Sequence, residues 1–237
     1  MITVCGKIQA DTLTVAVAAN FAETLESIVA GFEQAHPHSV VLVRGSSGRH
    51  YAQIVNGAPF DLFFSADSVR VQQLVVDQLV SPGQTMTYAI GQLVLWSPAS
   101  EPGTDIASQL QGARFKRLSM ANPRLAPYGQ AALEVLQGLD LTGVIKTQQI
   151  VRGVNVAQAY QFIATGNAEL GFVALSQVVQ EPLSQYWRVP QELYTPIKQK
   201  LAVLKDSIAS KAFLDYLASS EARALILLQG YQLPGND

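Results

Sequence analysis

The sequence contains little of what several classes of protein need. Cys5 is the only cysteine among 237 residues, so the chain from Asp11 onward has neither an internal disulfide nor a thiol for catalysis. The 16 basic and 18 acidic residues give a formal net charge of −2, and no segment is a basic block, which argues against a nucleic-acid partner. No apolar run approaches the roughly 20 residues that span a bilayer.

Sequence motifs for catalysis are also scarce. The chain has no G-x-G-x-x-G and no G-x-x-x-x-G-K-[ST], the glycine-rich loops that bind nucleotides. The three histidines, His36, His38 and His50, do not have the spacing of metal ligands. The segment Gly45-Ser46-Ser47-Gly48 differs from the G-x-S-x-G nucleophile elbow. We therefore expect no enzyme and no cofactor; the alternative from another class is an α/β hydrolase with Ser47 as nucleophile and His50 as base.

Apolar residues, by contrast, are abundant. Hydrophobic residues make up 49% of the chain and charged residues 14%, so it can bury a large core in one domain or in two smaller ones. The first ten residues include Lys7 and the small Ala10, but no apolar stretch long enough for a complete secretory signal. We expect residues 1–10 to be a leader remnant, with Asp11 as the mature start; an ordinary cytosolic N-terminus is the alternative.

Apolar strand-like runs alternate with helical patterns along the chain. Two sets of these runs are found, at 13–18, 40–43 and 60–64, and at 117–121, 149–152 and 170–174. Because the runs are apolar throughout, they predict an α/β fold with mostly parallel sheets and helices on both faces. Further runs near 88–96 and 197–204 predict two strands that cross between two lobes. The expected division is 11–87 plus 200–237 for lobe 1 and 88–199 for lobe 2.

Three short loops carry the functional signal. They read Ala-Ala-Asn-Phe at 18–21, Gly-Ser-Ser-Gly at 45–48 and Ala-Pro-Tyr-Gly at 126–129, and each lies between an apolar run and a helical pattern. The first turn of a helix has unpaired N–H groups and the positive end of the helix dipole, which together bind anions. Val156 begins a further helical pattern and can offer its N–H group in the same way. Such loops directed at one point would form an oxyanion site.

Each of these residues also has a simpler interpretation. Asn20 and either serine of the second loop can be ordinary helix N-caps, with Glu23 completing a capping box for Asn20. The Tyr128 ring can be packing material in the core. Arg44 and Arg49 flank the serine loop and can be solvated surface residues or can assist anion entry. Three loops of one design favour a shared site over three separate caps.

These loops belong to a longer set of motifs that identifies a family. The chain resembles the molybdate-binding proteins that serve ABC importers, within the type II periplasmic binding-protein class. The motifs that carry the resemblance are VAVAANF (15–21), GSSG (45–48), GAPFD (57–61), FSAD (64–67), YAIG (88–91), ANP (121–123), APYG (126–129) and GNAELGFVA (166–174).

The resemblance implies a tetrahedral oxyanion, molybdate or tungstate, held between the lobes by neutral donors. The implied donors are the side chain and N–H of Asn20, the hydroxyl and N–H of Ser47, and the N–H groups of Tyr128 and Val156. Ala19 would contribute at most its N–H group. Some relatives have a hydroxyl residue at the position of Ala19, and some a tyrosine near that of Ala174; this chain has neither. Most donors should therefore be backbone groups.

The resemblance also implies a cellular role. We expect a monomeric periplasmic receptor that delivers the anion to an ABC permease, with no nucleic-acid partner. A receptor for another tetrahedral oxyanion, such as sulfate, is the alternative with the same fold. A cytosolic module that senses anions is a further alternative.

Overall fold

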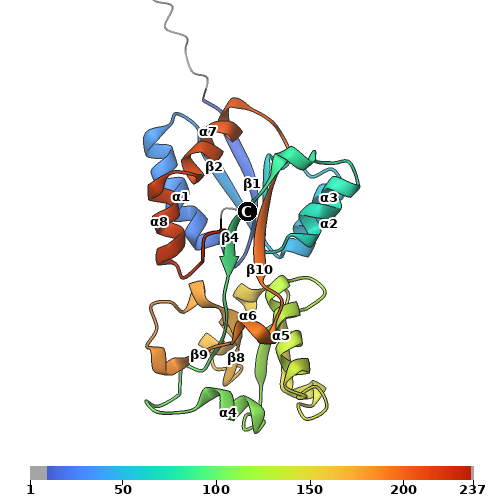
Figure 1. Ribbon diagram of the computed structural model, residues 1–237, viewed down its shortest axis with the longest axis vertical. Coiled ribbons are helices and arrows are strands. Elements are labelled where there is room, and N and C mark those ends of the chain that lie inside the picture. The colour runs from blue at the N-terminus through green and yellow to red at the C-terminus, as the bar shows by residue number, and fades with distance from the viewer. Residues whose placement is uncertain (1–9, 236–237) are drawn as a thin grey trace, which may run out of the picture.

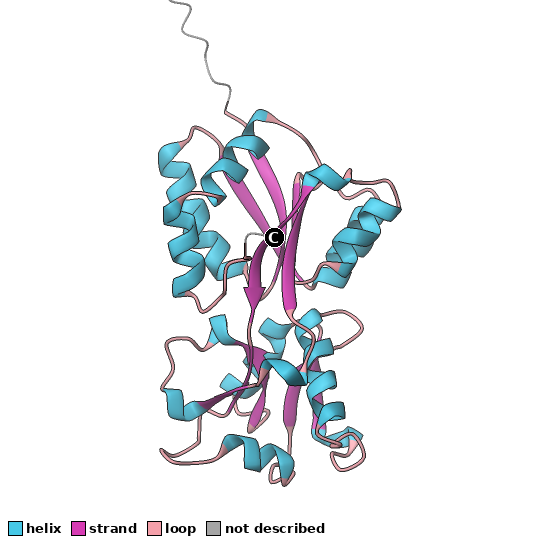
Figure 2. Ribbon diagram, viewed as in Figure 1, coloured by secondary structure: helices cyan, strands magenta, loops and turns pink. Residues whose placement is uncertain are grey.

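The computed structural model describes residues 10–235 of the chain, which form two lobes (Figure 1). The expected leader remnant falls on residues 1–10, so all of it except Ala10 lies outside the described residues, as does Cys5. Each lobe contains one five-stranded sheet with helices on both faces (Figure 2). The predicted two-lobed α/β fold is thus confirmed. None of the helices in the described part has the length and apolarity needed to cross a bilayer.

The first lobe is built on the sheet with strand order β2-β1-β3-β10-β4. Its strands are β1 (Thr12–Ala18), β2 (Ser39–Gly45), β3 (Leu62–Ser65), β4 (Thr85–Gly91) and β10 (Ile197–Val203). Its helices are α1 (Ala22–Ala35), α2 (Ser47–Val55), α3 (Val69–Val76), α7 (Ile208–Leu217) and α8 (Ser220–Leu228). Helices α1, α7 and α8 cover one face of the sheet, and α2 and α3 cover the other (Figure 1).

The second lobe is built on the sheet with strand order β7-β6-β8-β5-β9. Its strands are β5 (Leu93–Trp96), β6 (Leu118–Ala121), β7 (Ile150–Gly153), β8 (Leu170–Ala174) and β9 (Tyr186–Arg188). Its helices are α4 (Ile106–Gln111), α5 (Pro127–Gly138) and α6 (Val156–Ala164). Short 3₁₀ turns occupy Pro82–Gln84, Thr147–Gln149, Leu175–Gln177, Leu183–Gln185 and Gln191–Leu193.

Strand direction is mixed in both sheets. In the first lobe β1 runs parallel to β2 and β3, whereas β10 is antiparallel to β3 and β4. In the second lobe β6 runs parallel to β7 and β8, whereas β5 is antiparallel to β8 and β9. The expectation of mostly parallel sheets was therefore wrong for half of the strand pairs. An apolar run shows that a strand is buried on both faces, but it does not reveal the strand's direction.

The chain passes twice between the two sheets. It leaves the first sheet at Gly91, the last residue of β4, and enters the second at Leu93. It returns to the first sheet at Ile197, the first residue of β10. These two connections, at 91–93 and just before Ile197, lie side by side where the molecule is narrowest, and we call this region the waist (Figure 1). The division of the lobes as moving units, at 88 and 199, stays a prediction.

Candidate functional site

The loops predicted to bind an anion meet at one small cavity between the lobes. Its lining residues come from the ends of β1 and β2, the segment after β3, and the first turns of α2, α5 and α6. They are Ala18, Ala19, Asn20, Gly45, Ser46, Ser47, Ala66, Ala126, Pro127, Tyr128, Asn155 and Val156. The centre of a water molecule can move through about 10 Å³ of this space, so the lobes lie close together here. All five predicted site residues, Ala19, Asn20, Ser47, Tyr128 and Val156, are in the lining.

Three helices present their N-terminal turns at this cavity. Ser47 is the first residue of α2, Tyr128 is the second of α5 after Pro127, and Val156 is the first of α6. The N–H groups of these positions have no partner within their own helix, and the helix dipole makes this end positive. Proline fits the first position of α5 because an N–H group is not needed there. The geometry therefore supplies donors from both lobes.

The two serines of the second loop have different roles. The Ser46 hydroxyl caps α2 by accepting a hydrogen bond from the Arg49 N–H group, at 3.4 Å. The Ser47 hydroxyl accepts one from the Ala66 N–H group, at 2.9 Å, and Ser47 is only 1% exposed. A hydroxyl that accepts one hydrogen bond still has its own proton to donate. Ser47 is therefore held by the protein with a donor left for a ligand.

The side chain of Asn20, predicted to donate to the anion, forms hydrogen bonds within the protein instead. Its amide nitrogen donates to the Gln199 side-chain oxygen at 2.8 Å and to the Tyr231 hydroxyl at 3.2 Å. An amide nitrogen has two protons, so this side chain is committed to the protein. Asn20 is also not the cap of α1, because the N-cap is Phe21 and no side chain caps it. The backbone N–H group is what Asn20 can offer to an anion.

The Asn20 carbonyl is held as firmly as its side chain. It accepts hydrogen bonds from the Tyr231 hydroxyl at 2.6 Å and from the Ser176 hydroxyl at 3.1 Å. Burial raises the pKa of Tyr231 to about 12, so its hydroxyl stays protonated and can act as a donor. Gln199, Ser176 and Tyr231 support the site but were missed by sequence reasoning, because they lie more than 150 residues from Asn20 along the chain.

Ala19 does not offer a free donor. Its N–H group donates to the Gly45 carbonyl at 2.8 Å, which extends the pairing of β1 with β2 by one residue. The Ala19 N–H group is therefore engaged within the first lobe, and its contribution to an anion stays a prediction. Ala19 still lines the cavity, where its methyl group limits the space.

The Tyr128 ring contacts the crossing strands rather than the cavity alone. The side chain is 2% exposed, and its hydroxyl makes no hydrogen bond to any described residue. Burial raises the pKa of this hydroxyl well above its usual range, so it is neutral. A Cβ atom added at Gly91 would lie 2.2 Å from the Tyr128 hydroxyl oxygen. The ring of Tyr128 thus packs against the strands that connect the lobes, which agrees with the packing interpretation, while the residue also lines the cavity from the first turn of α5.

The charge around the cavity is low. Its lining contains no acidic or basic side chain among the described residues. Arg44 is paired with Glu26 at the surface, and both side chains are about half exposed. Arg44 also lines a neighbouring cavity of about 260 Å³ that shares Ala19, Asn20 and Asn155 with the site. The described lining therefore offers only neutral groups, and the donor set itself stays a prediction.

The geometry does not favour a serine hydrolase. Both His50 ring nitrogens are engaged, Nε2 with the Val17 carbonyl at 3.2 Å and Nδ1 with the Gln53 side chain at 3.1 Å. His50 is 1% exposed, and burial lowers its pKa. The Ser47 hydroxyl is bonded to Ala66 instead. The pairing of nucleophile and base that such an enzyme needs is not formed.

Comparison with known proteins gives a consistent result. The family model of the bacterial extracellular solute-binding proteins matches residues 13–232. Molybdate-binding protein ModA of Azotobacter vinelandii is 45% identical over 233 residues, covering 95% of this chain and 91% of that protein. The same-named protein of Rhodobacter capsulatus is 44% identical, covering 91% of this chain and 86% of that one.

Solved structures agree with the sequence matches. The periplasmic molybdate-binding protein of Azotobacter vinelandii superposes with a TM-score of 0.86 at 38% identity, covering 94% of this chain and all of that one. The sulfate-binding protein SubI of Mycobacterium tuberculosis superposes with a TM-score of 0.76 at 14% identity, covering 95% of this chain and 88% of that one. The second similarity shows a common fold only.

Proposed function

Because this chain belongs to the bacterial extracellular solute-binding proteins, we propose that it is the molybdate receptor of an ABC importer. One observation carries the proposal: N-terminal turns of helices from both lobes converge on a single cavity that has no charged side chain in its described lining. The relatives with 45% and 44% identity are both molybdate-binding proteins.

The proposed ligand shell consists of neutral donors. They are the hydroxyl and N–H group of Ser47 and the N–H groups of Asn20, Tyr128 and Val156. Ala19 forms part of the wall, with its N–H group engaged by the Gly45 carbonyl. Removing a dianion from water is costly, and it needs several donors to replace the lost hydration. Hydrogen bonds to a charged partner contribute about 1.5–3 kcal/mol each, so five of them offset a large part of that cost.

A fixed set of donors also selects among oxyanions. Molybdate and tungstate are nearly equal in size, whereas the smaller sulfate leaves some donors beyond hydrogen-bonding distance. Phosphate keeps a proton at neutral pH, and that proton needs an acceptor. The described lining has no carboxylate, the strongest acceptor for such a proton. The site should therefore bind molybdate and tungstate more tightly than sulfate or phosphate.

The remaining parts of the role follow from the same family. We place the protein in the periplasm as a monomer that closes its two lobes over the anion and presents the closed surface to the permease. The moving units would be 11–87 with 200–237 and 88–199, joined at the waist. Closure of two domains around a ligand is a standard hinge mechanism.

Titration calorimetry tests this function. Molybdate and tungstate should bind with similar affinity, and sulfate and phosphate at least about a hundredfold more weakly, a difference of about 2.7 kcal/mol. Equal or tighter binding of sulfate would support a sulfate receptor instead. Labelling of Ser47 by a serine-reactive phosphonate would favour the hydrolase alternative.

A further inference from the structure

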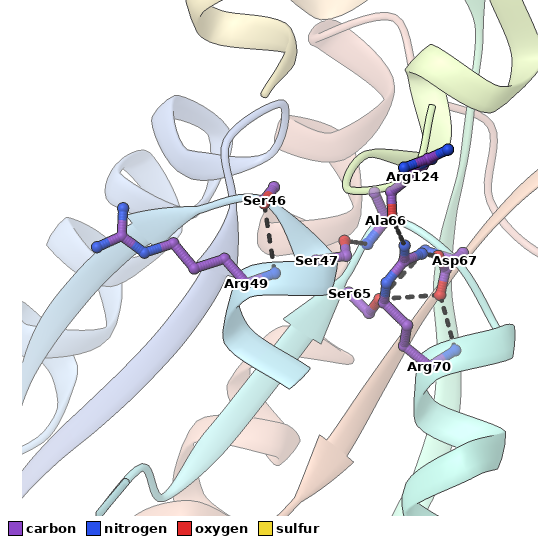
Figure 3. A network of polar contacts seen from close by, with 8 residues as sticks. All are labelled: Ser46, Ser47, Arg49, Ser65, Ala66, Asp67, Arg70 and Arg124. Atoms are coloured by element: carbon purple, nitrogen blue, oxygen red, sulfur yellow. Dashed lines mark hydrogen bonds and ion pairs between the residues drawn. The ribbon is translucent and has the colours of Figure 1, made fainter. Parts of the chain in front are cut away.

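The two lobes are joined beside the anion cavity by hydrogen bonds that the ligand shell does not explain. The Gly48 N–H group donates to the Leu125 carbonyl at 3.0 Å, and the Arg70 guanidinium donates to the Arg124 carbonyl at 3.1 Å. Gly48 lies in α2 and Arg70 in α3 of the first lobe, whereas 124–125 is the loop between β6 and α5 of the second lobe. Figure 3 shows Arg70 next to Arg124. These contacts bridge the lobes away from the waist.

We propose that Gly48, Asp67 and Arg70 form an interlobe latch that stabilises the closed form of the receptor. The latch holds the 124–125 loop by its carbonyl groups and slows release of the anion. The inference rests on the proposed function, because it assigns residues that control closure over the same site.

Arg70 is oriented for this contact by residues of its own lobe. Its guanidinium forms an ion pair with Asp67, and its N–H group donates to the same carboxylate at 3.0 Å. The Ser65 hydroxyl donates to that carboxylate as well, at 3.2 Å. The side chains of Arg70 and Asp67 are only 20% and 15% exposed. An arginine fixed in this way loses little further freedom when it binds a carbonyl on the other lobe.

Close approach of the lobes depends on Gly48. A Cβ atom at this position would lie 2.9 Å from the Leu125 carbonyl oxygen and 3.1 Å from both Nε and Nη2 of Arg70. A side chain at position 48 would force both the 124–125 loop and the Arg70 guanidinium to move away from α2. The absence of a side chain at Gly48, the second glycine of the Gly-Ser-Ser-Gly loop, therefore allows the 124–125 loop to approach the first lobe.

The latch and the anion site share the same two segments of chain. Ser47 precedes Gly48, and its hydroxyl accepts the hydrogen bond of Ala66, the residue before Asp67 (Figure 3). On the other lobe, the 124–125 loop leads directly into the first turn of α5, where Tyr128, a proposed N–H donor, lines the cavity. Fixing that loop fixes a donor of the second lobe over the anion. Closure and ligand binding are thereby linked through adjacent residues.

Variants of Arg70 test the latch. Arg70→Gln removes the guanidinium that binds the Arg124 carbonyl, and Arg70→Lys keeps the charge but not the forked geometry. Arg49→Gln is the matched control: it removes one positive charge next to the serine loop, and the exposed Arg49 side chain points away from Arg70 (Figure 3). Gly48→Ala tests the close approach independently, without changing any charge. Thermal unfolding of each variant verifies that it is folded.

The readouts are molybdate affinity, the dissociation rate and the radius of gyration from X-ray scattering. Arg70→Gln, Arg70→Lys and Gly48→Ala should each weaken binding about three- to tenfold, mainly through faster dissociation, with a larger radius of gyration in the absence of the anion. Arg49→Gln should keep the wild-type dissociation rate and radius of gyration. Wild-type dissociation rates in Arg70→Gln, wild-type affinity of Arg70→Lys, or an equal loss in Arg49→Gln would overturn the latch.

The scattering arm separates the two proposals. If the wild type does not bind molybdate, the proposed function fails, yet a more open ligand-free Arg70→Gln would still support the latch. If molybdate binds and closes the wild type and Arg70→Gln alike, the function stands and the latch fails.

Discussion

The hydroxyl oxygen of Ser47 lies 2.9 Å from the backbone nitrogen of Ala66 and accepts its hydrogen bond. Ser47 is the first residue of α2, and Ala66 follows the end of β3, so this contact fixes the serine loop to the neighbouring segment of the same lobe. It leaves the hydroxyl proton of Ser47 to be donated to a ligand. The two adjacent serines should consequently respond differently to mutation.

Ser47→Ala should weaken molybdate binding roughly 10- to 150-fold, because it removes one hydrogen bond to an anion, worth about 1.5–3 kcal/mol. It should also lower the free energy of unfolding by about 1–3 kcal/mol, because the buried Ala66 N–H group loses its acceptor. Ser46→Ala is the control, since it removes only a helix cap and should cost about 0.5–2 kcal/mol of stability. Calorimetry and urea unfolding of both variants check this; equal loss of affinity would mean that the hydroxyl of Ser47 is not a ligand.

Gly91→Ala should destabilise the protein by about 1–3 kcal/mol, because its Cβ atom would lie 2.2 Å from the Tyr128 hydroxyl oxygen. Tyr128→Phe alone should be nearly neutral and should retain molybdate binding, because the hydroxyl has no partner among the described residues and the N–H group is unchanged. In the double variant, the loss of the hydroxyl should relieve part of the cost. Urea unfolding of the wild type, the two single variants and the double variant gives the coupling energy between positions 91 and 128, expected at about 0.5 kcal/mol or more. Strictly additive changes in the free energy of unfolding would refute the contact between Gly91 and the Tyr128 hydroxyl.

His50 should make stability depend on pH. Burial lowers the pKa of His50 below its ordinary 6.5, so the unfolded chain binds a proton more readily than the folded one. This contribution is therefore complete above about pH 6.5 and declines as the pH falls from 6.5 towards the folded pKa, by at most about 1.4 kcal/mol per pH unit.

Unfolding in urea at pH 7.5, 6.5 and 5.5 measures this effect, with the non-titrating His50→Gln as reference. The stability advantage of the wild type over His50→Gln should shrink as the pH falls. A constant difference would show that the pKa of His50 is the same in the folded and unfolded chains.

The convergence of the loops could be predicted from the sequence because strands and helix starts are recognised from short stretches of residues. Apolar runs identified β1 and β2, and their ends, Ala18 and Gly45, are paired neighbours in parallel strands. Loops that follow such strands must emerge at the same edge of the sheet. The start of α5 could be recognised from Pro127 in the same way.

The detailed donor set could not be predicted, because it depends on contacts distant in sequence. The amide of Asn20 is taken by Gln199 and Tyr231, which β10 and the C-terminal segment bring to it from 179 and 211 residues away. The N–H group of Ala19 is taken by Gly45 through the register of two strands. Neither the strand register nor the antiparallel direction of β10 is encoded in an apolar run.

The central claim is that neutral donors from both lobes hold molybdate in one cavity. Anomalous diffraction from crystals of the molybdate complex tests it most directly, because molybdenum marks its own position. The account predicts one strong peak between the lobes, with oxyanion oxygens within about 3.2 Å of the Ser47 hydroxyl and of the Tyr128 and Val156 nitrogens. A peak elsewhere, or one coordinated by arginine or lysine side chains, would contradict it.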